Sequence, residues 1–135
     1  LRGKVRLFFK PFPLKSHEDA LAGDLALIAA ARMGKGWPFA RFLFRHFNEF
    51  HPSVLPDWAQ SVGLDREAFE AALEDEKTRQ ALAESKKDGL RNRVTGTPTL
   101  FIDGRQYHGD FESGALVDAL LEQYERVAGT AAKAR

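Results

Sequence analysis

Near the start of the chain, every second residue is apolar, and the residues between them are either basic or aromatic. Over residues 5–10, the apolar positions are Val5, Leu7 and Phe9. A period of two residues is typical of a β-strand, because successive side chains point to opposite faces. The pattern therefore predicts a strand here. Pro11 follows, and since proline has no N–H to give to a β-ladder, it predicts the end of that strand.

The middle of the chain repeats apolar side chains at the spacing of an α-helix. The predicted helices cover about residues 16–32, 37–50, 56–62, 65–73 and 77–88. At the start of the first, Ser16 to Asp19 has the spacing of a capping box. Further along that helix, Leu21, Leu25 and Ile28 share one face and are predicted to point inward.

Glycine and proline mark the boundaries between these helices. Gly34 and Gly36 predict the end of the first helix. Pro38 suits the first helical position of the second, because its missing N–H costs nothing there. Gly63 and Gly89 are predicted to end the third and the fifth helix.

The period returns to two near the C-terminal end. Residues 99–102 and 105–108 are predicted strands, and Asp103-Gly104 between them is a strong signal for a two-residue hairpin turn. A final amphipathic helix is predicted from its apolar side chains, which are Val117, Leu120, Leu121, Tyr124 and Val127. The order of strand, helices, hairpin and helix indicates an α/β protein.

Composition restricts the classes of function. The chain has 135 residues with 20 Lys and Arg against 19 Asp and Glu, so its formal net charge of +1 does not predict a nucleic-acid partner. The apolar content of 44% predicts a single folded domain over residues 1–135. No apolar run approaches the ~20 residues of a membrane span. The absence of cysteine excludes disulfides, thiolate metal sites and thiol nucleophiles.

Because the chain opens at Leu1 almost directly on a predicted strand, we expect it to be a processed or excerpted sequence. The cellular compartment stays open between the cytoplasm and, for an exported protein, an extracytoplasmic space such as the periplasm.

Patterns for other chemistries are weaker. No two histidines have HxxxH or HExxH spacing, so no metal site is predicted; they are His17, His46, His51 and His108. Arg41 and Arg45 lie among phenylalanines, as in a nucleic-acid patch, but helical spacing assigns most of the rings to a core and the basic side chains to solvent. The chain has no GxGxxG, P-loop or GxSxG motif, and we expect no cofactor.

The most informative pattern lies in residues 94–105, which read VTGTPTLFIDGR. Gly96 relieves crowding beside a proline that begins a strand, and Pro98 drives Thr97 toward extended backbone. If the Thr97–Pro98 bond is cis, the chain turns sharply and leaves the N–H and C=O of Thr97 facing outward. An extended peptide can pair with such groups by strand addition. A trans proline that merely starts an edge strand is the alternative.

The string GTPTLFIDGR, with a glycine and an amphipathic helix after it, resembles the second half of DsbA-like proteins of the thioredoxin fold. Residues 5–14 (VRLFFKPFPL) resemble the second core strand of that family and its proline-rich exit. Residues 34–39 and 58–65 resemble parts of its helical insertion. The resemblance implies a thioredoxin-like α/β domain with a helical insertion over about residues 16–90.

The same resemblance implies that Gly96, Thr97 and Pro98 form the loop that faces an extended polypeptide substrate, and that the Thr97–Pro98 bond is cis. Trp37 and Phe39 are candidates for lining a peptide groove beside this loop. The competing interpretation for both is a place in the core, where aromatic residues at the start of a helix are more often found.

Members of this family begin with a strand and a helix that carries a CxxC pair, whose lowered thiol pKa generates the attacking thiolate. This chain lacks that unit, so the resemblance brings no nucleophile. Two hypotheses follow. In the first, the chain is the substrate-binding and scaffold part of a thiol–disulfide oxidoreductase. In the alternative, it is a cysteine-free, non-catalytic module that binds extended peptides or a partner protein.

In the family's sheet, the absent strand lies between those that match residues 5–10 and 99–102. Without it, both predicted strands expose unpaired backbone groups. We expect one of three remedies: an added N-terminal segment, direct pairing of the two strands, or exchange of strands between two copies. A strand-exchanged homodimer is favoured, because a symmetric partner supplies identical strands.

Overall fold

A computed structural model of the chain describes residues 1–17 and 19–135. These residues form two compact units, which are considered separately. The helical unit is Lys10–Thr95, and the terminal unit combines Leu1–Phe9 with Gly96–Arg135. The predicted capping box includes Glu18, which lies outside the described residues.

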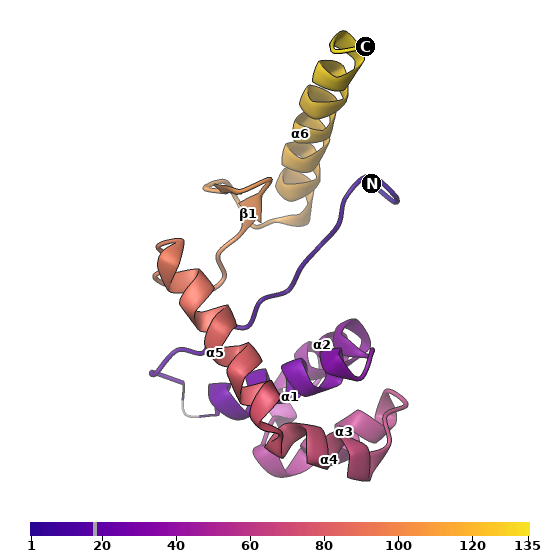
Figure 1. Cartoon of the computed structure of the whole chain (residues 1–135), viewed down its shortest axis with the longest axis vertical. Helices are drawn as coiled ribbons and strands as arrows, with labels where there is room; N and C mark the ends of the chain where they lie inside the picture. Colours follow the sequence, from indigo (N-terminus) through magenta and orange to yellow (C-terminus); the bar gives the residue numbers. More distant parts are fainter. Residues whose placement is uncertain (18) are drawn as a thin grey trace. The chain divides into compact units, whose positions relative to one another are not determined.

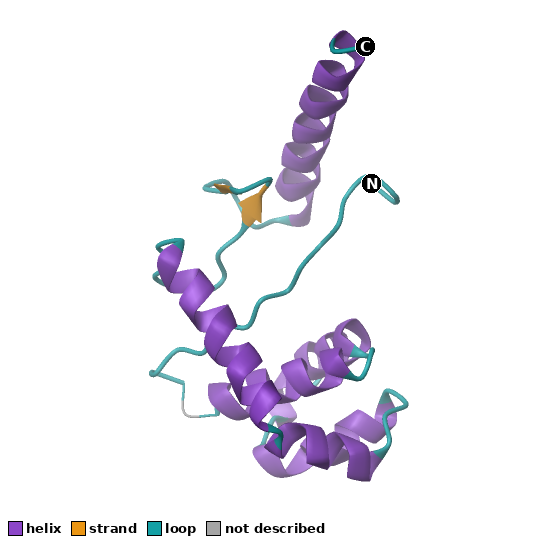
Figure 2. Cartoon of the chain, in the orientation of Figure 1, coloured by secondary structure: helices purple, strands orange, loops and turns teal. Residues whose placement is uncertain are grey.

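Most of the chain is helical (Figures 1 and 2). The helical unit contains α1 (Ala20–Arg32), α2 (Gly36–Arg45), α3 (Leu55–Ser61), α4 (Arg66–Glu74) and α5 (Glu76–Arg91), with 3-10 turns at Phe47–Glu49 and Pro52–Val54. The terminal unit contains β1 (Phe101–Ile102), β2 (Arg105–Gln106) and α6 (Ser113–Lys133). The second predicted helix was too long, because α2 ends at Arg45 and a tighter turn follows it.

Helix α1 is central to the helical unit and contacts α2, α3, α4 and α5. Its buried residues are mostly small: Gly23, Ala26, Leu27, Ala29 and Ala30. Small side chains allow neighbouring helices to approach closely. The predicted inward face is therefore partly wrong. Leu21 is 57% exposed, because the close contacts of α1 are made by its alanine face.

Aromatic rings fill the space between these helices. Phe39 of α2 and Phe69 of α4 are both fully buried, and their ring centroids are 5.7 Å apart. Asp65 caps α4, since its carboxylate accepts a hydrogen bond from the N–H of Ala68 at 2.9 Å. Phe69 thus reaches the core from a helix whose start is set by a local cap.

Helix α5 continues beyond its predicted end. It runs through Gly89 to Arg91, so that glycine does not stop the helix. A Cβ atom at this position would lie 2.5 Å from the ring of Phe12. Gly89 instead permits the close approach of Phe12 to the helix surface.

Residues 10–13 are held against α5 by hydrogen bonds from its side chains to their backbone. The buried Ser85 hydroxyl donates to the carbonyl of Pro11 at 2.7 Å. The Lys86 ammonium donates to the carbonyl of Pro13 at 2.6 Å and lies 3.6 Å from the ring centroid of Phe12. The prolines after the predicted strand therefore contribute acceptors to helix docking.

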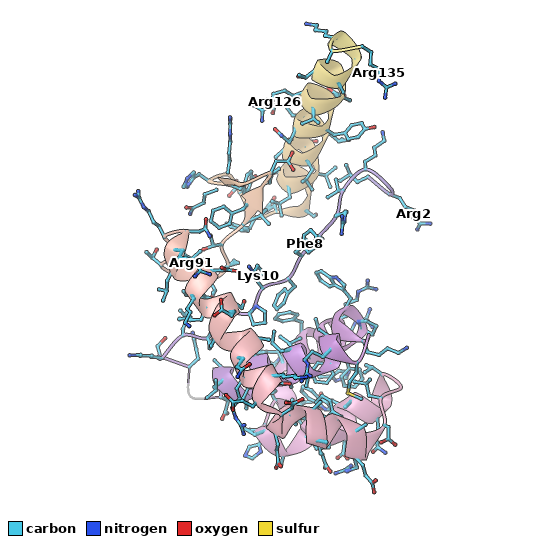
Figure 3. The ribbon with its side chains drawn as sticks, viewed as in Figure 1. Arg2, Phe8, Lys10, Arg91, Arg126 and Arg135 are labelled. Carbon is cyan, nitrogen blue, oxygen red and sulfur yellow. The ribbon has the colours of Figure 1, made fainter. Side chains whose placement is uncertain are left out.

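An ion pair holds the same segment near the C-terminal end of α5. Lys10 Nζ lies 2.6 Å from a carboxylate oxygen of Asp88, and Arg91 also contacts this carboxylate (Figure 3). The hydrogen bonds from Lys10 and Arg91, in that order, lower the pKa of the Asp88 carboxyl to about 2. Asp88 therefore stays ionised at neutral pH.

The predicted strand over residues 5–10 does not form. This segment runs as an extended loop, and Figure 2 draws it in teal. Within the described residues, the backbone groups of residues 5–8 make no hydrogen bond, and β1 pairs with β2 alone. Direct pairing of the two predicted strands is therefore wrong for this chain. A strand needs a hydrogen-bonded neighbour, and none of the described segments provides one for residues 5–8.

The predicted hairpin forms in the terminal unit. Asp103 and Gly104 have φ angles of 47° and 80°, the positive values that a type I′ turn needs at both central positions. The strands are shorter than predicted, with Phe101 opposite Gln106 and Ile102 opposite Arg105. The predicted final helix is α6, although none of its residues is buried.

We predict that Gly89→Ala destabilises the helical unit despite the better helix propensity of alanine. The new methyl group would displace the Phe12 ring, at a cost of about 1–3 kcal/mol, which outweighs the ~1 kcal/mol that alanine gains over glycine inside a helix. Urea unfolding followed by tryptophan fluorescence measures this, because Trp37 and Trp58 both belong to the helical unit.

Gly129→Ala is the matched control. It lies inside α6, where a Cβ atom would meet nothing within 4 Å, so it should raise helix content without loss of stability. Equal stabilisation by both substitutions would contradict the close approach of Phe12.

A second prediction concerns Asp24, a partly buried residue of α1. Burial raises the pKa of its carboxyl from 3.8 to about 6, against the lowering effect of the Lys86 charge. The folded chain then binds this proton more tightly than the unfolded chain, so the contribution of Asp24 to stability falls as pH rises from about 4 to about 6. Asp24→Asn should remove this dependence.

Urea unfolding of both chains at about pH 4 and about pH 7 tests the Asp24 prediction. The stability of Asp24→Asn relative to the unchanged chain should rise by on the order of 1–2 kcal/mol between those pH values, after allowance for partial solvent exposure. A stability difference that is the same at every pH would refute it.

Candidate functional site

The candidate loop, residues 96–100, lies in the terminal unit and leads directly into β1. The Thr97–Pro98 peptide bond is cis, which confirms what the family resemblance predicts. Thr97 and Pro98 are both exposed, whereas Gly96 and Thr99 are half-buried. The part of the loop that is most accessible is therefore the part that the sequence singled out.

Hydrogen bonds hold both ends of this loop. The Thr99 hydroxyl donates to the carbonyl of Gly96 at 2.6 Å and so closes the turn around Pro98. The carbonyl of Leu100 accepts from the N–H of Tyr107 at 2.8 Å, which extends the hairpin ladder by one bond beyond β1. The loop is thus attached to the hairpin along one edge.

The other edge offers free backbone groups. Within the described residues, neither the N–H nor the C=O of Thr97 makes a hydrogen bond, and β1 has no partner beyond β2. Exposed backbone groups without a hydrogen bond, next to the open side of a strand, are groups that an added strand can use. The N–H and C=O of Thr97 are therefore not used by the hairpin's own hydrogen bonds.

A contact between the turn and α6 positions the hairpin within the terminal unit. Gln123 of α6 donates to the Asp103 carboxylate at 2.7 Å. Arg126, which Figure 3 labels, donates to the side-chain oxygen of Gln123. A hollow of about 250 Å³ lies beside this contact, with Ile102 and Tyr107 among its lining residues. Helix α6 thereby supports the hairpin from which the loop extends.

Trp37 and Phe39 belong to the helical unit, whereas the loop residues belong to the terminal unit. Trp37 is 39% exposed at the start of α2, whereas Phe39 is fully buried against Phe69. The burial of Phe39 favours the core interpretation of that residue. A shared groove with the loop stays a prediction.

The histidines and arginines that were considered for metal or nucleic-acid sites have the following places in the structure. In the described residues, no three His, Asp or Glu side chains gather as they would around a metal ion. His51 instead caps a 3-10 turn by accepting from the N–H of Ser53 at 3.2 Å. Arg41 and Arg45 are exposed, as expected for basic residues on the solvent side of α2.

Sequence reasoning missed the anchoring role of Ser85, Lys86 and Gly89. Ser85 and Lys86 donate to backbone carbonyls of residues 11–13, and Gly89 lies against the ring of Phe12. These partners lie more than seventy positions earlier in the chain. No local pattern marks a serine or glycine that serves such a distant contact. Among the described helices, none is both long enough and apolar enough to span a bilayer.

Comparison with known proteins gives a consistent picture. The sequence matches the family model described as Thioredoxin over residues 1–122. It is 31% identical to the Na(+)/H(+) antiporter NhaA 3 of Salinispora tropica over 89% of this chain and 19% of that protein. It is 30% identical to the Na(+)/H(+) antiporter NhaA 1 of Salinispora arenicola over 97% of this chain and 20% of that protein.

A third relative, the Na(+)/H(+) antiporter NhaA 1 of Mycolicibacterium vanbaalenii, is 30% identical over 83% of this chain and 19% of its own length. The chain thus spans about a fifth of the length of these curated relatives. No solved structure gives a significant match. The match over most of its length, together with the cis-proline loop, hairpin and closing helix, establishes that the chain belongs to the thioredoxin family, as a thioredoxin-like domain with a helical insertion.

Proposed function

We propose that this chain is a non-catalytic thioredoxin-fold module that binds an extended polypeptide along residues 97–102. The observation that carries the proposal is the open backbone edge formed by Thr97 and β1, on a loop closed by the hydrogen bond between Thr99 and Gly96. An extended segment that pairs with this edge becomes a third strand beside β1 and β2. The main-chain bonds provide affinity that depends little on the identity of the bound sequence.

Side chains would add a preference for apolar residues at alternate positions. Phe101 is partly exposed at the open strand, and Pro98 is exposed in the loop. Successive side chains of a bound strand point to opposite faces, so one set contacts such apolar groups while the other faces solvent. We therefore expect the bound segment to alternate between apolar and polar residues.

Binding without redox chemistry is the function that the chain's own residues support. Thiol–disulfide exchange requires a thiolate as the attacking group, and the sequence has no cysteine. The relatives found by comparison are named antiporters, and this gives no support to the hypothesis of an oxidoreductase scaffold.

The names of these relatives also suggest a partner. Because the chain matches about a fifth of proteins that are named Na(+)/H(+) antiporters, we propose that it works beside a membrane transport protein. The bound polypeptide would then be an extended segment of that protein, in the same chain or in another.

The test uses a fluorescein-labelled heptapeptide of alternating valine and threonine, with binding followed by fluorescence anisotropy. One version carries N-methyl groups on alternate amides along one edge, and a second carries them along the opposite edge. If main-chain pairing holds the peptide, one version should bind about tenfold more weakly or worse, since two lost hydrogen bonds cost about 1–3 kcal/mol. The other version should bind as the unmodified peptide does.

A protein variant locates the site. Thr97→Pro removes the Thr97 N–H and should weaken binding of the unmodified peptide by about tenfold. Thr95→Pro is the matched control, because Thr95 is also exposed but precedes the loop. Far-UV circular dichroism checks that both variants keep their helices. Unchanged binding by a folded Thr97→Pro variant, or equal weakening by both N-methylated peptides, would count against the proposal.

A further inference from the structure

We propose that two copies of this chain associate by antiparallel pairing of residues 5–9 of one copy with residues 5–9 of the other. This interface is distinct from the peptide-binding edge at Thr97. The segment is extended, and Leu7 and Phe8 are 62% and 71% exposed. Within the described residues, the backbone of residues 5–8 makes no hydrogen bond, so both edges of this stretch can pair with another chain.

The order of residues in the segment makes it complementary to itself. In an antiparallel pair centred on Leu7, that residue lies opposite its own copy, and Val5 lies opposite Phe9. The apolar face then becomes one continuous stripe contributed equally by both copies. A two-fold axis requires such self-complementarity, and a shift of one residue would remove it by moving the apolar set to the other face.

The opposite face is also complementary. In the same register, Arg6 of each copy lies opposite Phe8 of the other. Within one chain, the Arg6 guanidinium already lies 5.2 Å from the centroid of the Phe8 ring, and Figure 3 shows Phe8 projecting from the extended segment. The pairing thus provides two contacts of a cation with an aromatic ring across the axis.

Lys4 and Lys10, the charged residues just beyond the two ends of the segment, do not oppose this pairing strongly. Like charges at the ends of paired strands usually protect an edge from association. Here Lys4 lies 4.7 Å from the ring centroid of Tyr124, and Lys10 pairs with Asp88 at 2.6 Å. Both ammonium groups therefore already have partners in their own chain, which leaves the central residues accessible.

Sedimentation velocity over a range of concentrations tests the proposal on the full chain. We expect a monomer–dimer equilibrium whose dissociation constant rises at least about tenfold in Leu7→Lys, because two lysines would face each other across the axis. Leu21→Lys is the matched control, since Leu21 of α1 is similarly exposed at 57% but lies outside the segment. It should dimerise as the unchanged chain does.

A cysteine at the axis tests the register, and the cysteine-free sequence leaves no competing thiol. Residues opposite each other in an antiparallel pair have Cα atoms about 4.5–5.5 Å apart, within the ~4.4–6.8 Å that a disulfide spans. Leu7→Cys should therefore form a covalent dimer on mild oxidation, and Leu21→Cys should not. If Leu7→Lys loses helix content, the cysteine test still decides whether residues 5–9 of two copies pair.

Several outcomes would overturn the proposal. They are a monomer at all concentrations, equal effects of Leu7→Lys and Leu21→Lys, and equal cross-linking of the two cysteine variants. Another is a monomer that binds vesicles of anionic phospholipid through this basic and aromatic segment. The peptide-binding proposal fails separately, because Leu7→Lys should bind the valine–threonine heptapeptide with unchanged affinity.

Discussion

A β-strand is stable only where a neighbouring chain accepts and donates its backbone hydrogen bonds. In the terminal unit, this requirement is met along one side of β1, by β2, and the described residues provide no partner for residues 5–8. Both open edges follow from that one constraint. The edge at Thr97 lies on a loop that the Thr99–Gly96 hydrogen bond closes, whereas residues 5–8 are extended and carry exposed apolar side chains. These differences suit the first edge to peptides and the second to its own copy.

The helical unit depends on close packing among its own helices. Helix α1 presents Ala26, Ala29 and Ala30 to its neighbours, so they approach closely and enclose the rings of Phe39 and Phe69. Contacts from α5 hold residues 10–13 against the same unit. The insertion that interrupts the thioredoxin fold is therefore a packed structure with its own core.

The loss of thiol chemistry and the retention of the loop point in one direction. This thioredoxin-family chain has no cysteine, and it has a cis-proline loop at which we propose that an extended polypeptide binds. Main-chain pairing with an extended segment needs no particular side chain at Thr97 or Pro98. Similarity to proteins several times longer is consistent with a module that acts beside another domain.

The sequence by itself determined the elements whose causes are local: the Asp103-Gly104 turn, the Asp65 cap and the cis-proline loop at Thr97. It also identified the family, because the matching motifs keep their order along the chain. Only the tertiary structure decided which face of α1 is buried, why α5 passes through Gly89, and that no described segment pairs with the backbone of residues 5–8. Each of these depends on what a distant segment provides: neighbouring helices, the Phe12 ring or a partner strand. A periodic pattern predicts that a segment can be a strand or a helix, but its neighbours determine whether its hydrogen bonds and apolar surface are satisfied.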